Sequence, residues 1–234
     1  MISQRFESLA QALRVFGEQY IRFQALMLID APEAVGNIDH AADGILNSFH
    51  GLHDAAQQHE EINFDFYANP FCAFVLQIRN ARHHNHARGI RGIHRCARTE
   101  DEPVNYILVN FPSTDQDDGG SFAEYYVSWY DMREYLDRRH PRHAASVAAS
   151  MSAIGVQIFE PWCEQEEYAF ERIFINIIPI IITACVDLVS EISGHINTDS
   201  LEAESFLDLF ETGTVAHFEE PTYLELTSAV FWPQ

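Results

Sequence analysis

The 234-residue sequence contains no lysine, and all 14 of its basic residues are arginines. Because the chain also holds 35 Asp and Glu residues, its formal net charge is −21. A uniformly acidic surface repels phosphate, so this charge argues against a protein that coats nucleic acid along its whole surface. A phosphate-containing ligand must therefore bind where arginines are locally concentrated.

Closely spaced cysteines, an apolar run near the N-terminus and a long apolar stretch are also missing. The four cysteines (72, 96, 163 and 185) lie far apart and form no CxxC pair, which predicts reduced thiols in a cytoplasmic protein. The N-terminal residues lack the apolar run of a secretory signal. The apolar stretch from Ile173 to Val186 contains Asn176 and Pro179 and falls short of the about 20 residues that span a membrane. We expect a buried core helix there and no membrane attachment.

The hydrophobic content of 47% and the 12% of aromatic residues are typical of a packed globular protein. A chain of this length can bury a large core, so it needs no disulfide or metal for stability. No internal repeat and no linker divides the sequence. We therefore expect residues 1–234 to form a single domain that needs no cofactor to fold.

Apolar residues at steps of three and four predict a mainly α-helical fold. The first three predicted helices cover about residues 2–31, 39–60 and 70–87, and they form a helical core within residues 1–96. Asn69 and Pro70 have the residue types preferred just before and at the start of a helix. Additional helices are predicted within 143–212, over 143–159, 161–193 (kinked or split at Pro179) and 199–211, after a short one over 131–139.

Two segments in the middle of the chain have a different character. Residues 104–111 and 122–130 are rich in β-branched and aromatic residues, and a Gly- and Asp-containing stretch lies between them. We predict a small β-hairpin inserted at 104–130, although the second segment could instead begin a helix. Its aromatic residues, Tyr125, Tyr126, Trp129 and Tyr130, are more typical of a core than of a platform for stacking bases.

Residues 79–98, called here the Arg/His segment, concentrate the positive charge. They read RNARHHNHARGIRGIHRCAR, with six arginines, four histidines and no acidic residue. Their charge of +6 leaves −27 on the other 214 residues. The segment begins inside the third predicted helix, where Arg82 continues an apolar stripe. An apolar face that becomes cationic partway along a helix indicates a site or an interface, and Arg with His suits phosphate chemistry.

Residues 79–84, RNARHH, match the pattern RNxxxH, which is expected by chance roughly 0.03 times in this composition. This pattern on a helix resembles the Rx4–6H motif of the HEPN superfamily, whose members are helical bundles and include metal-independent RNases of phage-defence and toxin–antitoxin systems. The resemblance covers the helical core within residues 1–96. It implies a HEPN-like bundle in which two protomers pair so that their motifs share one cleft.

The resemblance also implies roles for the motif residues. His84 would move a proton to or from an RNA 2′-hydroxyl or the leaving oxygen, and Arg79 would hold the scissile phosphate. Asn80 would orient these groups. The substrate would be single-stranded RNA, cleaved without a metal ion or other cofactor to a 2′,3′-cyclic phosphate. A cognate antitoxin or other regulatory protein is a further expected partner.

Helical geometry leaves the partner of Arg79 open, because positions 83 and 86 lie nearer to it on a helix than position 84. His83 and His86 are therefore alternative catalytic residues. We expect Arg82, Arg88, Arg91 and Arg95 to bind RNA phosphates, and for Arg88, Arg91, Arg95 and Arg98 contact with an acidic protein surface is equally compatible.

Two other functions fit the same residues. The first is a catalytically inactive HEPN-like module that binds a partner through the Arg/His segment. The second is a metal-binding helical protein, since His50, His53 and Asp54 lie at i, i+3 and i+4 on the second predicted helix. The motif favours the endoribonuclease, with a role in phage defence or a stress response.

Overall fold

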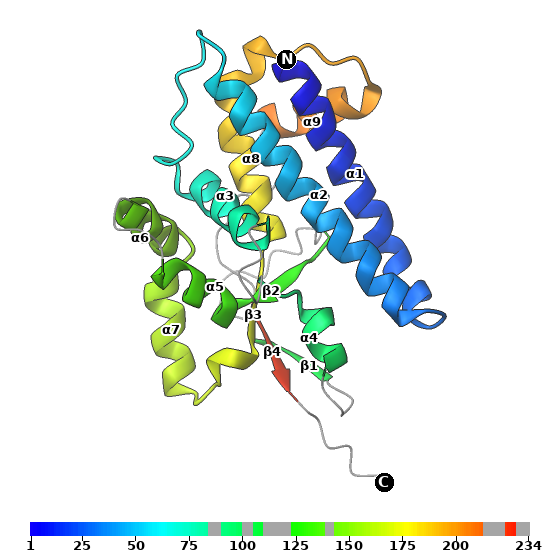
Figure 1. Cartoon of the computed structure of the whole chain (residues 1–234), viewed down its shortest axis with the longest axis vertical. Helices are drawn as coiled ribbons and strands as arrows, with labels where there is room; N and C mark the ends of the chain where they lie inside the picture. Colours follow the sequence, from blue (N-terminus) through cyan, green and yellow to red (C-terminus); the bar gives the residue numbers. More distant parts are fainter. Residues whose placement is uncertain (84–89, 100–104, 110–122, 139–142, 213–222, 228–234) are drawn as a thin grey trace.

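The computed structural model describes residues 1–83, 90–99, 105–109, 123–138, 143–212 and 223–227 (Figure 1). Within them the fold is mainly helical, with nine α-helices and one small antiparallel sheet. The predicted fold class is therefore confirmed. The long helices occupy the end of the molecule near the N-terminus, and the sheet lies towards the other end (Figure 1).

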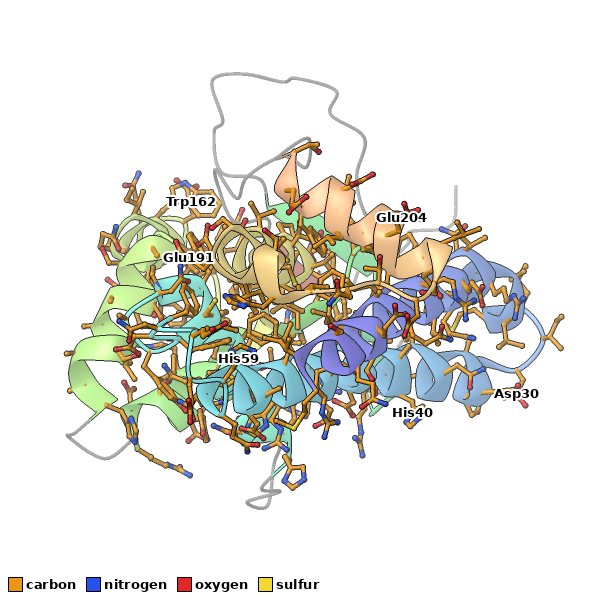
Figure 2. The ribbon with its side chains drawn as sticks, turned by 90° about the horizontal axis from the view of Figure 1, so that it is seen from above. Asp30, His40, His59, Trp162, Glu191 and Glu204 are labelled. Atoms are coloured by element: carbon orange, nitrogen blue, oxygen red, sulfur yellow. The ribbon has the colours of Figure 1, made fainter. Side chains whose placement is uncertain are left out.

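A helical hairpin forms one side of the molecule. Helix α1 (Ile2–Met27) and helix α2 (Ala31–Gln57) run side by side in Figure 1, and Figure 2 labels Asp30 at the turn between them. Apolar residues at helical spacing, such as Phe6, Leu13 and Phe16, bury one face of α1. The large contact between the two helices fixes the direction of α2.

Helix α2 begins eight residues earlier than predicted. The Asp30 carboxylate accepts a hydrogen bond from the backbone N–H of Glu33 at 3.0 Å, and Pro32 lies in the first turn. The first turn has N–H groups without helical partners, so a proline there removes no hydrogen bond. Pro32 therefore lies in the first turn of α2 and not only after the end of α1.

Helix α3 (Pro70–His83) passes through the centre of the bundle and contacts α2 and two helices of the C-terminal half, α6 (Ala144–Ala153) and α8 (Ile178–Ile192). The Asn69 side chain accepts hydrogen bonds from the backbone N–H groups of Phe71 and Cys72, at 3.1 and 2.9 Å. The predicted cap is thus confirmed. Every residue from Cys72 to Ile78 is buried, so after its first two residues the helix becomes accessible again in the turn that carries the motif. The predicted end of this helix, at residue 87, lies outside the described residues.

The C-terminal half is divided more finely than predicted. Helix α5 (Trp129–Asp137) is capped by Ser128 and begins two residues before its predicted start at residue 131. The predicted helix over 143–159 is two helices, α6 (Ala144–Ala153) and α7 (Val156–Gln165), because Gly155 between them has a left-handed backbone with φ of 74°. Helix α4 (Ile93–Thr99) lies beside the sheet (Figure 1).

The apolar stretch after residue 172 is also not one helix. A short helical turn, η2 (Phe170–Arg172), leads into strand β3 (Ile173–Asn176), and helix α8 (Ile178–Ile192) follows. Pro179 lies in the first turn of α8 and does not kink a longer helix. The turn η3 (Ser193–His195) and helix α9 (Leu201–Glu211) complete this half, and α9 packs on α1 and α8.

The sheet has the order β1-β4-β3-β2, with β1 at Asn105–Val109, β2 at Tyr126–Ser128 and β4 at Tyr223–Thr227. Both predicted strands are present, but they are not paired with each other as a hairpin. Strand β1 pairs with β4, β4 with β3, and β3 with β2, so the two lie at opposite edges. Tyr125, Tyr126 and Trp129 are buried, as predicted.

One apolar cluster of buried residues extends from Ile2 to Phe210 and joins the N-terminal hairpin to the C-terminal helices. The four cysteines are buried and form no disulfide. By length and composition the window Ile178–His195 could cross a membrane, but 61% of it is buried inside the protein, as in the expected core helix.

Asn176 joins the sheet to the bundle. Its side-chain oxygen accepts hydrogen bonds from the backbone N–H groups of Tyr125 and Ile178, both at 3.1 Å, and the residue is 4% exposed. We expect Asn176→Ala to lower the free energy of unfolding by about 2–4 kcal/mol, because two buried N–H groups lose their acceptor. Chemical denaturation measures this change. Asn197→Ala, at an exposed position, is the control; equal stability of the two variants would contradict the role of Asn176.

Candidate functional site

A row of polar residues on α2 faces the motif turn of α3. Asp39, Asp43, Asn47, His50 and Asp54 follow one another at steps of three or four, so they lie along one side of the helix. Asp43 and Asn47 hydrogen-bond to arginines of the motif helix, and Asp39 lies against Gly92 in the segment that follows it. The site is therefore built by α2 and α3 together, and α2 supplies its acidic and amide groups.

Arg82 is the most deeply placed cation of the site. Its Nε donates to Asp43 Oδ1 at 2.5 Å, and one terminal nitrogen donates to the backbone oxygen of Ile90 at 3.3 Å. Its side chain is 12% exposed, and its guanidinium lies 5.6 Å from the ring centroid of Tyr125. Burial alone would lower the pKa of Arg82, but Tyr125 and Asp43 outweigh it and raise that pKa above its ordinary value. Arg82 therefore stays charged and holds the site together.

Tyr125 links the sheet to the same row on α2. Its hydroxyl donates to Asp39 Oδ1 at 2.6 Å, and burial raises its pKa, so it remains a neutral donor. Gly92 passes directly over this pair: a Cβ there would lie 2.9 Å from both Asp39 Oδ1 and the Tyr125 hydroxyl. Only glycine fits this close approach, which brings residues 90–92 back onto α2.

Arg79 lies one turn before Arg82 and is only partly buried. Its Nε donates to Asn47 Oδ1 and one terminal nitrogen donates to Asn80 Oδ1, both at 3.2 Å. Both partners are uncharged amides, so the positive charge of Arg79 is not neutralised by these contacts. The two amides hold the guanidinium plane in place while leaving its charge for a ligand.

A pocket of about 210 Å³ opens at this point. Its lining comes from α2 and α3, and consists of Asp43, Leu46, Asn47, Arg79, Arg82 and His83. Two guanidinium groups and the ring of an exposed histidine thus meet at one opening. A pocket of this size admits a phosphate group or part of a nucleotide rather than a whole ligand of drug size.

His50 lies beside this pocket on α2. Its Nδ1 is 3.2 Å from Asp54 Oδ2, and the same carboxylate accepts from His53 Nδ1 at 3.1 Å through its other oxygen. Burial lowers the pKa of His50, and the positive charge of Arg79 lowers it further. The ring is therefore mainly neutral at pH 7, with the Asp54 contact favouring a proton on Nδ1 and leaving Nε2 as the basic nitrogen.

The other predicted site residues have different positions. Arg91 forms a two-point ion pair with the buried Asp131, at 2.7 and 2.9 Å. Arg95 is exposed on α4, away from the lining of the pocket. His84, His86 and Arg88 lie outside the described residues. The structure thus groups Arg79, Asn80, Arg82 and His83, while Arg91 belongs to a second contact between the 90–92 segment and α5.

The Arg/His segment therefore presents less unpaired positive charge in the fold than its sequence alone indicates. Asp43 and Asp131 offset two of its six positive charges, those of Arg82 and Arg91. Sequence reasoning missed Asn47 and the proximity of His50 to Arg79. The polar spacing of residues 39, 43, 47, 50 and 54 was the available signal, and it gains meaning only when α3 is placed against it.

Comparison of the chain with protein-family models, with curated proteins and with solved structures finds no match.

The two arginines should differ in their effect on stability. We expect Arg82→Ala to lower the free energy of unfolding by about 1–3 kcal/mol, because it leaves a mostly buried carbonyl and Asp43 without their partner. Arg79→Ala should lower it by less than about 1 kcal/mol, since its amide partners remain near solvent. Urea denaturation of both variants tests this. An equal loss of stability for the two would show that Arg79 is also structural.

Proposed function

We propose that this chain is a metal-independent endoribonuclease that acts from the pocket at Arg79. The observation that supports it is the meeting of Arg79, Arg82 and His83 at one opening, with the amides of Asn47 and Asn80 orienting the Arg79 guanidinium. These are residues of the motif that resembles the HEPN signature, and the bundle around them is mainly helical, as such a domain requires. The reaction needs a phosphate-binding cation and proton-transfer groups, and the pocket offers both.

Each residue has a proposed task. Arg79 binds the non-bridging oxygens of the scissile phosphate and stabilises the additional negative charge of the transition state. Asn80 and Asn47 position Arg79. His84 exchanges protons with the 2′-hydroxyl or the departing 5′-oxygen, with His83 or His86 as the alternative. Arg82 holds the motif turn against α2 through its ion pair with Asp43.

His50 is a second proton-transfer group that the pairing of α2 with α3 adds to the proposal. RNA cleavage by 2′-hydroxyl attack uses a base that accepts one proton and an acid that gives another. The lowered pKa of His50 keeps it in the basic form near neutral pH, and Asp54 orients its ring. His50 on α2 would then act as the base, and a histidine of the motif segment as the acid.

The charge distribution restricts the substrate. RNA would approach only at the Arg/His segment, with Arg88 and Arg95 as further phosphate contacts, because the rest of the molecule is acidic. Single-stranded RNA fits best, since its 2′-hydroxyl can rotate into line with the leaving oxygen. We further propose a cytoplasmic homodimer that joins two such pockets, and a regulatory protein such as an antitoxin that covers them.

Cleavage of a mixed RNA pool in EDTA is the direct test. Wild-type protein should yield fragments that end in 2′,3′-cyclic phosphate. Arg79→Ala should reduce the rate by about 10²–10³-fold because the phosphate loses its charged ligand, and His84→Ala by about 10²–10⁴-fold. Gel electrophoresis measures the cleavage rates, and the resistance of the fragment ends to phosphatase identifies the cyclic phosphate. Substitutions of His83 and His86 identify the histidine that acts.

Arg22→Ala is the matched control, because Arg22 is an exposed arginine on α1 far from the motif in sequence. Its activity should equal that of wild type. An inactive wild-type protein that still binds RNA through Arg79 would replace the nuclease with the non-catalytic binding module. Activity that appears only when a divalent ion is added would contradict a metal-independent mechanism.

The pH dependence tests His50. A base works in its neutral form, and the folded pKa of His50 lies below its ordinary value of 6.5. We therefore expect the cleavage rate to persist as the pH falls through 6.5 and to decline only at lower pH. In His50→Ala this acidic limb should disappear or move, with a lower maximal rate. An unchanged limb in that variant would remove His50 from the mechanism.

A further inference from the structure

A second group of histidines lies at the end of the molecule near the N-terminus. His59 and Glu61 follow the C-terminal end of α2, and His195 is the last residue of η3, which follows α8. Figure 1 shows these two segments at the same end of the molecule, and Figure 2, which looks down on that end, labels His59. Residues separated by more than 130 positions in the sequence are thus brought together by the fold.

Their ligand atoms converge. One nitrogen of each imidazole and one oxygen of Glu61 all lie within 4.8 Å of one another. His195 Nδ1 is 3.7 Å from Glu61 Oε2, and the two imidazole rings are 4.9 Å apart between centroids. An ion with bonds of about 2.0–2.2 Å to two His nitrogens and one carboxylate oxygen fits between them after small side-chain rotations.

The His59 side chain has a buried nitrogen, Nδ1, for which the described residues supply no hydrogen bond. A buried polar nitrogen without a partner is unfavourable, and a bound cation would accept its lone pair. The backbone on both sides is already fixed, because Ile62 N–H donates to His59 O at 3.1 Å and Ile196 N–H donates to Ser193 O at 2.9 Å. Little chain ordering would oppose binding.

The other histidine group, His50, His53 and Asp54, is less suited to a cation. Both of its imidazoles already contact Asp54 through Nδ1, and the positive charge of Arg79 acts on His50. By contrast, Glu60 and Glu61 follow His59 directly in the sequence, and no arginine occurs after Arg172. The net charge of −21 also attracts divalent cations in general.

We propose that His59, Glu61 and His195 bind one Zn²⁺ ion that joins the end of α2 to the end of α8. Two imidazoles with one carboxylate and a position left for water are a common zinc ligand set. The ion would tie the loop that precedes α3 to η3, and so stabilise the bundle at the end opposite the sheet. This site is independent of the proposed cleavage, which is assayed in EDTA.

Calorimetric titration of metal-stripped full-length protein with Zn²⁺ tests the proposal. One equivalent should bind, and His59→Ala and His195→Ala should each weaken binding at least about tenfold, since even residues that only support zinc ligands have effects of that size. Co²⁺ should bind in the same place and show the visible absorption of tetrahedral cobalt.

Neighbouring residues supply the controls. Glu61→Ala changes a side chain that is 76% exposed, so it tests the site even where a histidine variant fails to fold. Glu60→Ala, also exposed, and His40→Ala, labelled further along α2 in Figure 2, should bind zinc as wild type does. The absence of zinc binding by wild type would overturn the proposal. So would binding that survives His59→Ala, His195→Ala and Glu61→Ala but is lost in His50→Ala.

Discussion

The ion pair between Arg82 and Asp43 is the contact on which the candidate site depends. A guanidinium that is 12% exposed needs a compensating charge, and α2 supplies it at 2.5 Å. The same guanidinium reaches the Ile90 carbonyl and the Tyr125 ring, and Tyr125 in turn donates to Asp39. These contacts hold α2, α3, the return at 90–92 and the start of β2 in one arrangement. Arg79 is presented next to the pocket because Arg82 fixes the turn that carries it.

This arrangement changes the meaning of the charge pattern. The Arg/His segment carries +6 in sequence, but Arg82 and Arg91 each meet an aspartate from another element. Those two arginines act between parts of the fold, whereas Arg79 hydrogen-bonds two amides and forms no ion pair with the described residues. Neighbouring arginines on one short segment thus have opposite roles, which their partners on α2 and α5 assign.

Helices were predictable where a capping signal and an apolar period agree. Asn69 and Pro70 marked the start of α3 correctly because capping is a local property of a few adjacent residues. The stretch after Arg172 was predicted as helix, yet its first part is strand β3, buried on both faces. A short apolar run has no period that separates a buried strand from a buried helix. One of its partners, β4, lies about 50 residues later in the chain, so neighbouring residues could not indicate this pairing.

The sequence by itself determined the mainly helical class, the cap of α3, the burial of the aromatic residues at 125–129 and the place where positive charge concentrates. These follow from composition and from contacts between near neighbours. Only the tertiary structure decided that β1 and β2 lie at opposite edges of the sheet, that Arg82 is structural while Arg79 faces a pocket, and that His59 meets His195. Each of these depends on which distant segments pack together, and that choice is made by the burial of the whole core.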